Sequence, residues 1–94
     1  MVPPLAADLL LFARALLLWP VQSRSDVARR LIAETEVAHR HWLLHGTVHP
    51  AFGDGSLVSR ALLLSPRPEP MASDPDYLQA LETVAWVIRS HSHR

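Results

Sequence analysis

The sequence predicts an all-α fold, a small irregular bundle of about four helices. Three observations carry this prediction. Apolar residues recur at helical spacing in four stretches, no stretch shows the alternation of a strand, and glycines and prolines gather between the stretches. The chain has 94 residues, enough for one hydrophobic core but not for two domains. We therefore expect one helical domain over residues 1–94, with a polar tail at about residues 90–94.

The first helix is expected at residues 5–19, because prolines 3 and 4 suit a helix start and proline 20 denies the chain a further helical hydrogen bond. Its expected buried stripe consists of Leu5, Leu9, Phe12 and Leu16. Leu11, Ala15 and Leu18 lie on the side where solvent is expected, so this helix is apolar on more than one face. The stretch is too short for a membrane span and lacks the basic start of a signal peptide.

The second helix is expected to start at an N-cap, Ser25, and to run to His45, with Gly46 ending it. Its predicted buried stripe consists of Ala28, Leu31, Thr35, Ala38 and Trp42, with Ile32 beside it. On the opposite face, acids precede bases by four residues in the pairs Asp26–Arg30 and Glu36–Arg40. That spacing predicts a solvated face.

The sequence of residues 49–57 predicts a compact, well-defined turn between the second and third helices, which we call the corner. Proline 50 favours extended backbone at the residue before it, Phe52 is expected to fold inward, and two glycines allow positive φ. Either Asp54 or Ser56 can cap the helix that follows. An anion site at this helix start is the alternative, but the Asp54 charge opposes it. The corner residues are His49, Pro50, Phe52, Gly53, Asp54, Gly55 and Ser56.

A short third helix is expected at residues 57–64, followed by a stiff, proline-rich connector at residues 65–70. The last helix is expected to start at Asp74, with Pro75 in its first position. Its predicted core face consists of Tyr77, Leu81, Val84 and Ile88, with Leu78 and Ala85 flanking it. Trp86 falls outside that face.

Composition excludes several classes of function. Nine arginines balance nine carboxylates, so no excess positive charge favours nucleic acid or an anionic membrane. Cysteine is absent, which rules out disulfides and thiolate chemistry. No GxSxG motif is present, and Glu34 and Glu36 point to different sides of their helix. We expect a cytoplasmic protein that is not an enzyme and needs no cofactor.

The surplus apolar positions predict association. Leu11, Leu18 and Trp86 remain after each helix has given one face to the core, and we expect them to contact another protein or a second copy of this chain. The alternative is a bundle that buries its first helix centrally. The preferred hypothesis is an accessory or regulatory interaction module that can form oligomers.

Two weaker alternatives concern other ligands. His41 and His45 share a helix face and His49 follows, a spacing that can present three imidazoles to Zn²⁺. Histidine also favours helix C-termini without any metal, because imidazolium interacts well with the negative end of the helix dipole. Nucleic-acid regulation would depend on Arg29 and Arg30, but neighbouring acids weaken that basic face.

Four segments together carry a resemblance: ARRLIAE at residues 28–34, HPAFGDGSL at 49–57, PEP at 68–70 and DPDY at 74–77. The chain resembles a family of short, uncharacterised alphaproteobacterial proteins, a domain of unknown function. The resemblance covers most of the chain and implies a small, self-contained cytoplasmic protein. It implies no activity, cofactor or catalytic residue. Where that family is expected to have tryptophan, this chain has Phe52.

Overall fold

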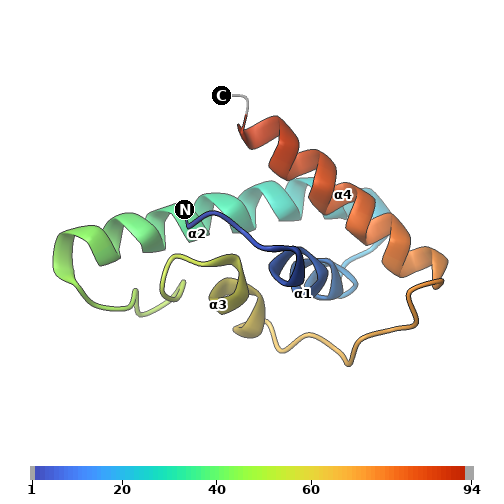
Figure 1. Ribbon diagram of the computed structural model, residues 1–94, viewed down its shortest axis with the longest axis horizontal. Coiled ribbons are helices and arrows are strands. Elements are labelled where there is room, and N and C mark those ends of the chain that lie inside the picture. The colour runs from blue at the N-terminus through green and yellow to red at the C-terminus, as the bar shows by residue number, and fades with distance from the viewer. Residues whose placement is uncertain (1, 93–94) are drawn as a thin grey trace.

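The computed structural model describes residues 2–92, and these form four α-helices and one 3₁₀-helix (Figure 1). The elements are α1 (Ala6–Leu16), η1 (Val21–Ser23), α2 (Arg24–His45), α3 (Leu57–Leu62) and α4 (Pro75–Ser92). Within the described part of the chain, the β-type pairing is a single bridge between His49 and Gly53. The predicted all-α bundle is confirmed.

The first helix occupies the centre of the bundle. It packs against α4 and α3 and, to a lesser extent, against α2 (Figure 1). The largest fully buried side chains come from all four helices. They are Phe12, Leu16, Leu31, Ile32, Thr35, Leu57 and Val84. Central burial of α1 was the alternative to a free second face, and that face is covered in part, since Ala15 is buried, Leu11 is half-buried and Leu18 is exposed.

The predicted stripe of α1 is right in its second half and wrong at its start. Phe12 and Leu16 are fully buried, whereas Leu5 is exposed because it is the N-cap residue, before the first turn. Ala15, expected on the solvent side, is fully buried. The helix also ends at Leu16, and the chain turns before it reaches proline 20.

An arginine at the start of α2 explains that early turn. Arg24 is only 2% exposed, and its Nε donates to the carbonyl oxygens of Leu16 and Trp19 at 3.1 and 3.0 Å. Its two terminal nitrogens donate to the Asp76 carboxylate on α4 at 2.7 and 3.1 Å. The hydrogen bond from Arg24 lowers the pKa of Asp76. One buried cation therefore joins the end of α1 to α2 and α4.

The second helix begins at Arg24, so the predicted N-cap at Ser25 is wrong. The 3₁₀ turn Val21–Ser23 precedes the helix and places Ser23 at the cap position, without a side-chain hydrogen bond. At the other end the prediction is confirmed, because Gly46 has a φ of 68° and its N–H donates to the Trp42 carbonyl.

Ionic contacts on α2 differ from the predicted four-residue pairs. Asp26 contacts Arg29 at 3.4 Å, three residues along the helix. Glu36 contacts His91 of α4 at 3.0 Å, and this hydrogen bond lowers the pKa of Glu36. The second contact crosses between helices, so the α2 face that carries Glu36 is not simply a solvated one.

The third helix is shorter than expected and ends at Leu62, beyond which Ser65 adopts a φ of 51°. The fourth helix starts as predicted, since Asp74 Oδ1 accepts the amides of Asp76 and Tyr77 at 2.9 and 3.2 Å. Its core face includes the predicted Tyr77 and Val84. The polar tail is helical through residue 92, and residues 93–94 lie outside the described range.

Candidate functional site: the free end of helix 2 and the corner below it

Beyond its first half, α2 extends past the end of α4 (Figure 1). The predicted core stripe of α2 is buried from Ala28 through Leu31 and Thr35 to Ala38. The next residue of the stripe, Trp42, is 44% exposed, so its prediction as a core residue is wrong. The reason is length, because the contact between His91 and Glu36 marks the last turn of α4 against α2, and Trp42 lies nearly two turns farther on.

The apolar surface around Trp42 includes its neighbours. Leu43 is 68% exposed and Leu44 is 78% exposed, while Val48 is exposed in the loop that follows. We refer to Trp42, Leu43, Leu44 and Val48 as the distal patch. Adjacent apolar residues exposed on a helix end are unusual for a monomer that uses its apolar positions for folding.

Beneath the helix end, the corner is organised by His49. Its backbone N–H donates to the Gly53 carbonyl at 2.9 Å, and the Gly53 N–H donates back at 3.2 Å. Its ring Nδ1 accepts the amides of Ala51 and Phe52, both at 3.0 Å. The ring also stacks on Phe52 with the centroids 4.8 Å apart. The imidazole therefore acts as a hydrogen-bond acceptor at the centre of the turn.

Three predicted metal ligands come together here. The His41 ring lies 4.7 Å from that of His45 and 5.1 Å from that of His49, measured between centroids. Desolvation, followed by repulsion from the other two rings, lowers the pKa of His41. Yet no group of three or more histidines and carboxylates within residues 2–92 is arranged to hold a metal ion. The Nδ1 of His49 faces its own backbone instead.

The glycines of the corner allow close packing. Gly55 has a φ of 96°, and a Cβ atom built on it would lie 2.7 Å from the Cα of His39 on α2. Gly53 has a φ of 91°, and a Cβ there would meet the Ser59 side chain. Both predictions of positive φ are confirmed, and the turn at residue 55 touches α2 directly.

Of the two cap candidates, Ser56 is the N-cap of α3, and its Oγ accepts the Ser59 amide at 3.1 Å. Asp54 supports it, because Asp54 Oδ1 accepts the Ser56 amide at 2.9 Å and the Ser56 hydroxyl at 2.6 Å. The hydrogen bond from the Ser56 hydroxyl, aided by the Ser56 amide, lowers the pKa of Asp54. Asp54 is therefore anionic at neutral pH.

The corner and the helix end enclose a groove. Its volume is about 400 Å³, and the residues that line it are Val2, His39, Trp42, Leu43, Asp54 and Ser56. Val2, Trp42 and Leu43 supply apolar walls, and Asp54 supplies the negative charge. The groove and the distal patch share Trp42 and Leu43, so they form one continuous surface.

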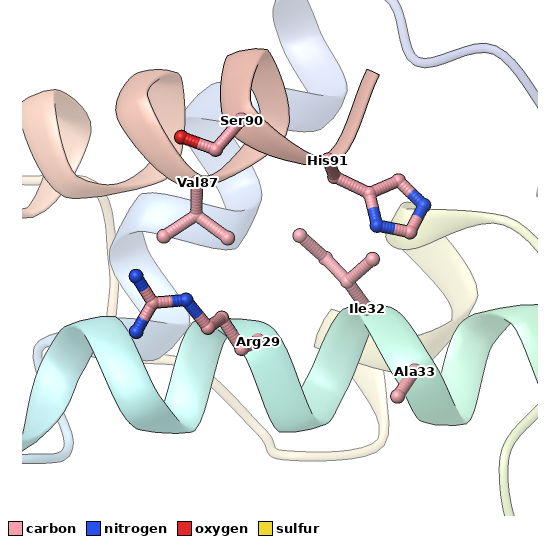
Figure 2. Close-up of a pocket in the computed structure, with 6 residues that line it drawn as sticks. All are labelled: Arg29, Ile32, Ala33, Val87, Ser90 and His91. Atoms are coloured by element: carbon pink, nitrogen blue, oxygen red, sulfur yellow. The ribbon is translucent and has the colours of Figure 1, made fainter. Parts of the chain in front are cut away.

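A smaller notch of about 130 Å³ lies between α2 and α4. Figure 2 shows Val87 pointing toward α2 and Ile32 pointing toward α4, with Arg29 and His91 at either end. The Arg29 guanidinium carbon lies 4.9 Å from the centre of the exposed Trp86 ring. The notch is the size of one side chain, and its ends are already paired with Asp26 and Glu36.

The three predicted partner contacts are not brought together at the groove. Trp86 is exposed beside the notch, Leu18 is exposed after the end of α1, and Leu11 is half-buried. Sequence reasoning missed the distal patch because Trp42 fits the core spacing. One signal was available, since the predicted second helix is longer than any other element and part of its stripe has no helix of equal length to cover it.

Comparison with known proteins places the chain in a family. Residues 2–88 match the family described as Domain of unknown function (DUF7742). The chain belongs to this family. No curated protein and no solved structure matches it. Within the described residues, no helix combines the length and hydropathy needed to cross a membrane.

Proposed function

We propose that this protein is a small, non-enzymatic helical interaction module that binds another protein through the free end of α2. The observation that carries the proposal is Trp42, a residue that fits the core spacing of α2 but has no helix over it. A tryptophan in such a position acts as an anchor when a partner supplies the missing cover. The role is accessory or regulatory, and cytoplasmic.

The energetics support a binding role. Leucine side chains gain about 2 kcal/mol each on full burial, and Leu43 and Leu44 retain most of their surface in water. Tryptophan buries still more surface and is among the residue types enriched at binding hot spots. Because the rest of the bundle already has a closed core, these side chains contribute little to folding. A partner that covers these side chains would therefore gain the free energy of their burial.

The other predicted contacts are secondary in this proposal. Trp86 and Arg29 form an exposed aromatic and cationic pair at the edge of the notch, and Leu18 adds a separate apolar position. Leu11 is half-buried, so it contributes less than expected. The residues that carry binding are therefore Trp42, Leu43 and Leu44, with Trp86 as an additional contact.

Affinity isolation with matched variants tests the proposal. The parent chain is compared with a Trp42→Ser, Leu43→Ser double variant and with a Leu18→Ser control, all at equal expression. We expect a stoichiometric partner that is retained by the control and lost from the double variant. The proposal is wrong if no recovered protein depends on Trp42 and Leu43 while both variants keep the thermal stability of the parent.

A further inference from the structure

The residues that line the groove beside Trp42 indicate which chemical groups a partner would present there. This inference rests on the proposed function. Its apolar walls come from two parts of the chain: Val2 in the extended N-terminal segment and Trp42 and Leu43 in α2. The Val2 N–H donates to the Gly55 carbonyl at 3.4 Å, which holds that segment against the corner. The walls therefore have a defined shape before any partner arrives.

Asp54 is the carboxylate among the described residues that line the groove, and none of these residues is an arginine. The hydrogen bonds that the described residues make to this carboxylate reach Oδ1, and none of them reaches Oδ2. The Ser56 hydroxyl donates to Asp54, so it does not compete as a donor to a ligand. A partner group beside Asp54 should therefore carry N–H donors and positive charge.

The aromatic ring strengthens this preference. Trp42 lines the same groove as Asp54, and an indole face attracts a cation in addition to apolar groups. A carboxylate near an exposed indole suits a guanidinium or ammonium group whose neighbour is apolar. An acidic partner would place two like charges together and would lose the cation–π contact.

We propose that the groove takes a peptide segment of another protein in which an apolar side chain stands next to an arginine or lysine. The apolar side chain packs against Trp42 and Leu43, and the cation pairs with Asp54. The occupant is thus a segment with one apolar and one basic side chain. Its positive charge distinguishes it from an acidic segment, and its apolar side chain, which fits the groove walls, distinguishes it from a purely polar segment.

Three capped dipeptides test the proposal on the intact, ¹⁵N-labelled protein by NMR titration at millimolar concentration. The probe is N-acetyl-leucyl-arginine amide, and the controls replace arginine by glutamate or leucine by glycine. We expect shifts of the Trp42 indole N–H and of the Leu43 and Ser56 amides, with the arginine probe binding about fivefold more tightly than the glutamate probe. High salt should reduce that ratio.

Asp54→Asn is the informative variant, because asparagine retains the oxygen that accepts the Ser56 amide and lacks the charge. It should bring the arginine-to-glutamate ratio close to one, whereas the matched control Asp26→Asn, on the first turn of α2, should leave the ratio unchanged. Equal binding of both probes by the parent would overturn the charge preference and keep the proposed apolar surface. Absence of shifts at the groove with every probe, or concentration-dependent shifts there without any probe, would overturn this partner assignment altogether.

Discussion

Replacing His49 tests how the corner is held together. His49→Ala removes the acceptor of the Ala51 and Phe52 amides and the stack on Phe52. A hydrogen bond contributes about 1 kcal/mol net, and an aromatic pair contributes about 0.5 kcal/mol or more. Because the site is partly hydrated, we expect the free energy of unfolding to fall by about 2 kcal/mol in urea titrations.

An asparagine at the same position separates the acceptor from the ring. Its side-chain oxygen can accept a backbone amide two residues on, as in an Asx-turn. His49→Asn should therefore recover about half of the loss. The reasoning is refuted if His49→Ala unfolds at the same urea concentration as the parent, or if asparagine is as destabilising as alanine.

His41 predicts a pH dependence of stability, because desolvation and the neighbouring imidazoles lower its pKa in the folded state from 6.5. The unfolded chain therefore takes up that proton first, and stability present above pH 6.5 is lost as the pH falls below it. Urea titrations across this range provide the measurement, and equal acid sensitivity of the parent and a His41→Gln variant would contradict the role assigned to His41.

Three further predictions have defined outcomes. Arg24→Ala should cost about 3 kcal/mol of unfolding free energy, because it removes the buried donor that the Trp19 carbonyl and the Asp76 carboxylate share and leaves the Leu16 carbonyl with the Trp19 amide alone; a loss below about 1 kcal/mol by urea titration would contradict that role. Gly55→Ala should cost at least about 2 kcal/mol, since its Cβ would press on α2, whereas Gly46→Ala, with open space around it, should cost about 1 kcal/mol for its positive φ alone. Equal costs would mean that the corner does not pack tightly on α2. Leu11→Glu should lower the thermal midpoint more than Leu18→Glu, because Leu11 is half-buried and Leu18 is exposed, and the reverse order would show that α1 packs differently.

Local rules predicted the ends of helices where a cap or a special backbone angle decides them. Asp74, Gly46 and Ser56 perform their expected roles, because each depends on residues within a few positions along the chain. The start of α2 was wrong for the opposite reason. Arg24 is anchored by Asp76, more than fifty residues away, and such a contact has no local pattern.

The candidate site was predictable only in part. The spacing of the histidines placed His41, His45 and His49 together correctly, but the spacing could not show that Nδ1 of His49 turns to its own backbone. Helical periodicity identified the stripe that ends in Trp42, and it could not show where α4 stops covering that stripe. Periodicity tells which side chains share a face, whereas exposure depends on the length and position of the neighbouring helix.

Site-specific photo-crosslinking tests the central claim, that the free end of α2 is the binding surface. A benzophenone amino acid replaces Leu43 in one variant and Ala7, which is exposed on α1, in the control. We predict a discrete adduct of defined mass from position 43, absent from position 7 and lost when Trp42→Ser is added. Equal crosslinking from both positions, or an adduct that persists without Trp42, would contradict the account.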